Sequence, residues 1–140
     1  MELVFKATTR GGAYTISVFD DGGIYGGKDR YSIYTDWSTD YADTKDEVLA
    51  AIFFAVFDGT RYTKVETDLL GISSRLVDIV KTFDTKYKYL EKEPKGSDAR
   101  ILYFDIVRCV KNNLREGVPE QDIFNKIDES LLKMGFNKVA

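Results

Sequence analysis

Residues 44–57 read TKDEVLAAIFFAVF, and this stretch decides the predicted fold. Its start fits a capping box, in which the Thr44 hydroxyl accepts a hydrogen bond from the Glu47 amide and the Glu47 carboxylate reaches back to the helix start. The residues that follow are apolar on more than one stripe, so we expect a central helix that packs on the face of a sheet. Asp58-Gly59 is expected to end it, with Gly59 as a left-handed cap. The apolar positions at helical spacing are Leu49, Ile52, Phe53 and Val56.

The residues before this helix alternate between apolar and polar side chains, which is the pattern of β-strands. Residues 3–9 and 13–19 flank a glycine-containing turn at 10–12 and predict a β-hairpin. A short extended piece at 24–25 and a strand over 30–37 follow. Because only a few residues connect these segments, we expect an antiparallel meander.

The residues after the central helix predict a mainly helical second half. Residues 62–67 fit either a short strand or a loop. The three helical patterns that follow start at Ser73 or Ser74, at Ser97 or Asp98, and at Pro119. The apolar stripe of the last helix is Ile123, Ile127, Leu131 and Met134. Short links make the last two helices an antiparallel hairpin.

Together these patterns predict an α+β fold: a small N-terminal antiparallel β-sheet with one packed helix, followed by a C-terminal three-helix bundle. A chain of 140 residues has the usual length of one domain. We therefore expect a single domain over residues 1–140, with the sheet and first helix in 1–68 and the helical part in 72–140.

The composition removes several classes of function. The chain contains no histidine, which excludes histidine-based triads and proton shuttles and removes most zinc sites. We therefore expect neither a metal nor another cofactor, and an enzyme ranks behind a binding protein. The single cysteine, Cys109, cannot form an internal disulfide, so the cytoplasm is the expected location. The longest apolar run, 48–57, is too short to span a bilayer, so no membrane partner is expected.

Two short stretches resemble ligand-binding loops and fail on their details. Residues 22–28 match the phosphate-loop spacing, but Asp29 stands where serine or threonine should hold magnesium, and a strand pattern follows instead of a helix. Residues 36–47 place oxygen-bearing side chains at several positions of a calcium loop, but Tyr41 replaces the glycine that makes the sharp turn. We interpret the first stretch as a glycine-rich hairpin and the second as a solvated acidic loop.

The second stretch also supports the leading functional hypothesis. It interleaves aromatic and acidic residues, which suits a partner with a basic groove because carboxylates replace phosphate charges and rings supply apolar contact. The predicted partner-binding residues are Tyr34, Asp36, Trp37, Asp40, Tyr41, Asp43 and Asp46. The alternative is that these aromatic rings belong to the core. We predict a non-catalytic binding or inhibitor protein that occupies a basic surface of a protein partner, with viral or mobile-element anti-defence (anti-CRISPR-like) proteins as one setting.

A second hypothesis rests on the arginines of the helical half. Their planar guanidinium groups could hold the phosphates of a small ligand such as a signalling nucleotide, with the protein acting as an oligomer. The candidate residues are Arg75, Arg100, Arg108 and Arg115. The alternative is that they are solvated and form local ion pairs. Direct nucleic-acid binding is not expected, because the net charge is −3.

Overall fold

The computed structural model describes residues 1–9, 15–22, 30–57, 62–92 and 97–135. The sequence-based expectations for residues 10–14, 24–25 and 58–59, and for most of the phosphate-loop match, lie outside these ranges. In chain order the elements are β1 (Glu2–Thr9), β2 (Thr15–Asp20), β3 (Tyr31–Tyr34), β4 (Thr39–Ala42), α1 (Lys45–Phe57), β5 (Tyr62–Asp68), α2 (Ser73–Glu91), α3 (Asp98–Arg115) and α4 (Glu120–Lys133). The fold is α+β, with the antiparallel sheet first and helices after it, as predicted.

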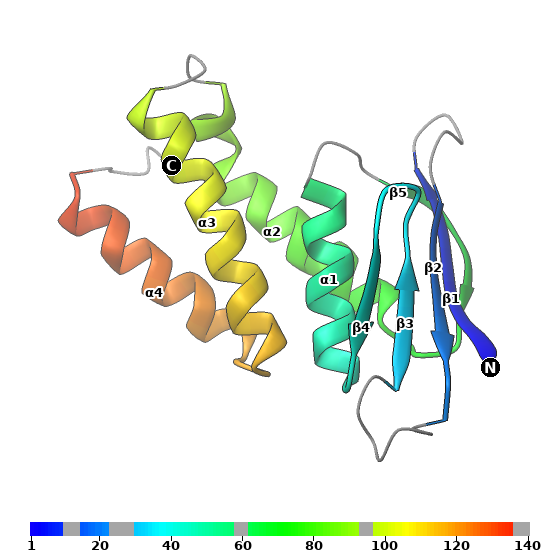
Figure 1. The fold of residues 1–140 in the computed structure, drawn as a ribbon. Helices are drawn as coiled ribbons and strands as arrows, with labels where there is room; N and C mark the ends of the chain where they lie inside the picture. The colour runs from blue at the N-terminus through cyan, green and yellow to red at the C-terminus, as the bar shows by residue number, and fades with distance from the viewer. Residues whose placement is uncertain (10–14, 23–29, 58–61, 93–96, 136–140) are drawn as a thin grey trace.

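The described strands form an antiparallel sheet in the order β4-β3-β2-β1-β5. Phe5 lies opposite Val18, and Val18 lies opposite Ile33, so these three side chains share one face of the sheet. All three are buried, because α1 covers this face. The described helices lie on that side of the sheet, and the opposite face carries none of them (Figure 1).

One strand prediction needs correction, and the structure resolves another that the sequence left open. The strand expected over 30–37 ends at Tyr34, and the chain turns through residues 35–38 and returns as β4. Residues 36–47 were predicted to be a solvated acidic loop, but residues 39–42 of this segment form the edge strand β4. The ambiguous residues 62–67 form β5, which pairs with β1 at the other edge of the sheet.

Helix α1 begins with the predicted cap in a shifted form. The Glu47 amide donates to the Thr44 hydroxyl at 3.2 Å, but the Glu47 carboxylate accepts from the Asp43 amide at 2.9 Å instead of from the Thr44 amide. The expectation of a central helix is confirmed, because Leu49, Ile52 and Phe53 are fully buried. The sheet covers one side of α1, and α3 packs on another side.

The starts of the later helices follow the sequence only in part. Ser97 caps α3 as predicted, with its side chain accepting from the Arg100 amide at 3.2 Å. Neither serine near the start of α2 caps it; the Asp68 carboxylate accepts from the amides of Ile72 and Ser73 at 3.1 and 2.9 Å. Helix α4 begins at Glu120, one residue later than predicted, and Pro119 occupies the cap position before it.

Aromatic packing joins the two halves of the chain. Phe83 of α2 makes edge-to-face contacts with Phe53 of α1 and Tyr103 of α3, each with ring centroids 5.7 Å apart, and with Tyr87 at 5.2 Å. In α4 the buried stripe contains Phe124, whereas Met134, which the sequence placed in it, is exposed. Buried residues of the sheet and of all four described helices belong to one hydrophobic cluster.

Candidate partner-binding surface

The turn between β3 and β4 carries two of the predicted binding residues, Asp36 and Trp37. The Thr35 amide donates to the Ser38 carbonyl at 2.9 Å, and the Ser38 amide donates to the Thr35 hydroxyl at 3.0 Å. These bonds fix the turn through both of its ends, so Asp36 and Trp37 lie at its tip. Both side chains are exposed.

The predicted aromatic residues lie at the surface of this end of the sheet. The exposed fractions are 37% for Tyr34, 46% for Trp37 and 55% for Tyr41. The alternative that these rings fill the core does not describe this structure. Burial of Trp37 and Tyr41 would have removed the leading hypothesis, and it is not observed.

Tyr34 and Tyr41 belong to the sheet face that no described helix covers. Tyr34 is opposite Ser17 and Tyr41 is opposite Ser32, one residue out of phase with the buried Val18 and Ile33. Phe19 lies on this face as well and meets Tyr34 edge-to-face, with centroids 5.7 Å apart and planes at 75°. The sequence prediction omitted Phe19. The available signal was its position, which alternates with Ile16 and Val18 and so points to the opposite face.

Three of the four predicted carboxylates accompany these rings. Asp36 is exposed in the turn before β4, Asp40 is exposed within β4, and Asp43 is exposed directly after it. Because Asp40 is opposite Ile33, its side chain belongs to the helix side of the sheet edge. We define the acidic–aromatic surface as Tyr34, Asp36, Trp37, Asp40, Tyr41 and Asp43.

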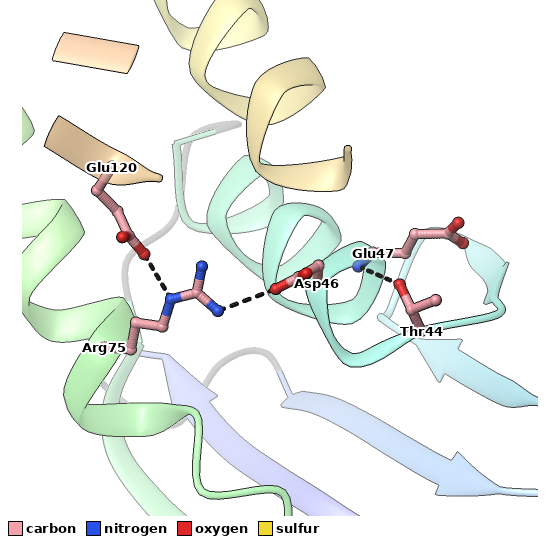
Figure 2. Close-up of polar contacts among 5 residues, drawn as sticks. All are labelled: Thr44, Asp46, Glu47, Arg75 and Glu120. Atoms are coloured by element: carbon pink, nitrogen blue, oxygen red, sulfur yellow. Dashed lines mark hydrogen bonds and ion pairs between the residues drawn. The ribbon is translucent and has the colours of Figure 1, made fainter. Parts of the chain in front are cut away.

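Asp46 does not belong to this surface. Its carboxylate pairs with the Arg75 guanidinium at 3.0 Å, and Arg75 also pairs with Glu120 (Figure 2). Desolvation lowers the pKa of Arg75, but the hydrogen bonds to Glu120 and Asp46 outweigh it and raise the pKa overall. Gly117, at a φ of +77°, lies against the Asp46 carboxylate, where a Cβ would come within 3.1 Å of its oxygen. Asp46 therefore ties α1 to the helical half.

The four arginines of the second hypothesis do not converge within one chain. Arg75 is held by two carboxylates. Arg100 donates to the Glu91 carbonyl at 2.7 Å, and Arg108 pairs with Asp105 at 3.1 Å. Arg100 and Arg115 stand near opposite ends of α3, which places them roughly 22 Å apart along the helix axis. The small-ligand hypothesis stays a prediction, because the described residues do not bring these four arginines together in one chain.

A small hollow adjoins the acidic–aromatic surface at the free edge of β4. Its volume is about 80 Å³. It brings Asp40 and Glu47 together with the cations Lys111 and Arg115, which the sequence prediction had not associated with this segment. The Lys111 ammonium lies 4.2 Å from the centre of the Phe54 ring. The lining residues are Asp40, Tyr41, Glu47, Ala50, Ala51, Phe54, Lys111 and Arg115.

No family model, curated protein or solved structure that we compared with the chain matches it. Function must therefore be argued from the residues themselves. Within the described residues, no three histidine, cysteine, aspartate or glutamate side chains group as metal ligands would. None of the helices in that part of the chain combines the length and apolar character that a bilayer crossing requires.

Proposed function

We propose that this protein is a non-catalytic binding protein that occupies a basic surface of a protein partner through the acidic–aromatic surface. The observation that carries the proposal is the exposure of Tyr34, Trp37 and Tyr41 beside exposed carboxylates. Large rings at the surface suit an interface, because tyrosine and tryptophan are among the side chains that contribute most to binding.

The rings and the carboxylates would contribute in different ways. Covering roughly 100 Å² of a ring would contribute about 2 kcal/mol, before the costs of association. An exposed ion pair contributes about 1 kcal/mol or less. The rings would therefore supply most of the affinity, while the carboxylates would orient the partner and accelerate the encounter in a salt-dependent way.

The charge of the segment indicates the class of partner. Residues 34–43, which contain the whole acidic–aromatic surface, include three carboxylates and no lysine or arginine. Such a segment is complementary to proteins whose basic grooves bind nucleic acid, because its carboxylates can take the places of phosphates. Within this class we propose the role of an inhibitor. The viral or mobile-element anti-defence setting and the cytoplasmic location are parts of the same proposal, supported by the small size, the acidity and the single cysteine.

A charge-reversal experiment tests the proposal. The triple variant Asp36→Lys, Asp40→Lys, Asp43→Lys is compared with the wild type as bait in an extract of the host cells in which the protein is made. The affinity for the purified partner is then measured. We expect the reversal to weaken binding by at least about a hundredfold and to abolish the salt dependence of association.

A matched control carries the same change of net charge elsewhere. Asp78, Asp105 and Glu129 are exposed on α2, α3 and α4, so replacing them by lysine leaves the acidic–aromatic surface unchanged. The control variant should retain the partner. Equal affinity of all three proteins for the partner would refute the proposed function.

A further inference from the structure

Strand β4 ends the sheet and leaves one of its edges open. Among the described elements, β3 is the only strand that pairs with it. The bond from the Thr35 amide to the Ser38 carbonyl sets the phase of the β3–β4 ladder. Because hydrogen-bonded and non-hydrogen-bonded pairs alternate in an antiparallel ladder, Asp40 and Ala42 direct their backbone groups to β3. The amides and carbonyls of Thr39 and Tyr41 therefore point to the free edge.

We propose that the partner adds an extended segment to this edge as a further strand, with its backbone bonded to Thr39 and Tyr41. This inference rests on the proposed function and names its mode of recognition. Side chains of an added strand alternate between the two faces. On the open face they would meet the Tyr41 ring. On the helix side they would lie over the hollow, where Asp40 and Glu47 stand together with Lys111 and Arg115.

The charge of the edge selects the occupant. Two copies of β4 paired edge to edge would bring their carboxylates side by side, and charged residues on an edge strand oppose such self-pairing. Lys111 and Arg115 offset the two acids inside the hollow, so the selecting charge is that of the exposed Asp36, Asp40 and Asp43 in and beside β4. A strand that carries lysine or arginine and no acid is complementary to these three carboxylates. The geometry therefore points to a basic, extended segment of a different protein, and not to a second copy of this chain.

The test uses the isotope-labelled full chain and a short synthetic peptide of alternating lysine and threonine. On saturation we expect the amide protons of Thr39 and Tyr41 to exchange with solvent at least about tenfold more slowly, because they become hydrogen-bonded. A peptide in which glutamate replaces lysine should not have this effect. Protection that is absent at about 1 mM basic peptide, or that falls on other amides, would overturn strand addition.

A second peptide separates the failure of this inference from the failure of the proposed function. Methylation of every backbone nitrogen keeps the peptide's charge but removes its hydrogen-bond donors. We expect it to bind at least about tenfold more weakly. Equal binding of both peptides would overturn strand addition and leave the acidic–aromatic surface as the binding site. If the unmodified peptide binds the wild type measurably and binds the lysine triple variant with the same affinity, the proposed function would be overturned.

A protein variant gives an independent check. Thr39→Pro removes an outward amide that the β3–β4 ladder does not use, whereas Thr39→Val keeps that amide. The proline variant should bind the basic peptide at least about tenfold more weakly than the valine variant. Equal binding by the two variants, with the amide spectrum of the sheet preserved, would contradict the proposal.

Discussion

Phe83 offers the most direct perturbation of the shared core. It is fully buried on α2 and meets rings from α1, α2 and α3. Replacing it by leucine keeps an apolar side chain of good helix propensity but removes the ring that meets all three neighbours. The variant therefore tests whether the contact between the two halves of the chain stabilises both.

The size of the effect follows from these contacts. Each edge-to-face pair contributes about 0.5–1.5 kcal/mol beyond the area it buries, and a leucine recovers part of the loss by packing in the same space. We expect Phe83→Leu to lower the free energy of unfolding by about 2 kcal/mol, which is less than the 3–5 kcal/mol typical of a change from phenylalanine to alanine. For a chain of this length the corresponding fall in melting temperature is roughly 6–10 °C.

Two spectroscopic probes report on different parts of the molecule. Trp37 is the only tryptophan and lies in the turn between β3 and β4, so its fluorescence reports on the sheet. Far-ultraviolet circular dichroism reports mainly on the helices. In urea titrations of the leucine variant, both transitions should move together to lower denaturant. Val77→Ala, at an exposed position of the same helix, is the control and should change the unfolding free energy by less than about 0.5 kcal/mol.

Separate transitions for the two probes would contradict a core shared by the two halves. A helical transition that moves while the Trp37 transition stays in place would show that the halves unfold independently. The single domain predicted over residues 1–140 would then be wrong. A leucine variant as stable as the Val77→Ala control would refute the assignment of stability to the ring contacts.

Two further substitutions test the contacts that fix the helices. Asp68→Ala should lower the unfolding free energy by about 1 kcal/mol at neutral pH through loss of the α2 cap. Although desolvation raises the pKa of Asp68, hydrogen bonds from Ser73 and neighbouring amides lower it overall, so its contribution is present above the unfolded-state pKa and is lost as the pH falls through the folded-state value. Urea titrations over a pH series should therefore show the difference from wild type shrinking in acid, and a difference independent of pH would contradict this. Tyr87→Phe removes the hydroxyl that donates to Asp128 at 2.9 Å and should cost about 1 kcal/mol in the same assay, whereas Tyr89→Phe, at an exposed ring, should change little. Equal losses would argue against a role for this part-buried hydrogen bond.

Local patterns in the sequence predicted the central helix and the buried faces of the later helices. Residues 44–57 contain both a capping sequence and an apolar surface wide enough to indicate burial on several sides. In α3 the buried residues are Tyr103, Ile106, Val107, Val110 and Leu114. Their spacing matches the helical period, so the sequence alone places them on one face. These features depend on neighbours in sequence, so the chain alone reveals them.

The missed features lack the residue patterns by which strands, caps and surfaces are usually recognised. Strand β4 has exposed side chains at Thr39, Asp40 and Tyr41, so it lacks the apolar alternation by which a strand is recognised. The α2 cap comes from Asp68, outside the ordinary capping position. For the candidate surface, the sequence grouped the rings with the carboxylates, but only the structure separates Asp46 from them and adds Phe19.

The position of β1 between β2 and β5 affects how the sheet can fold while the chain is being synthesised. β1 ends at Thr9, and β5 begins only at Tyr62, after the chain has crossed the sheet as α1. A nascent chain that leaves the ribosome can pair β1 with β2 early, but the other edge of β1 stays open until β5 emerges. Since open edges recruit foreign strands, this interval is when the protein is most exposed to aggregation during translation.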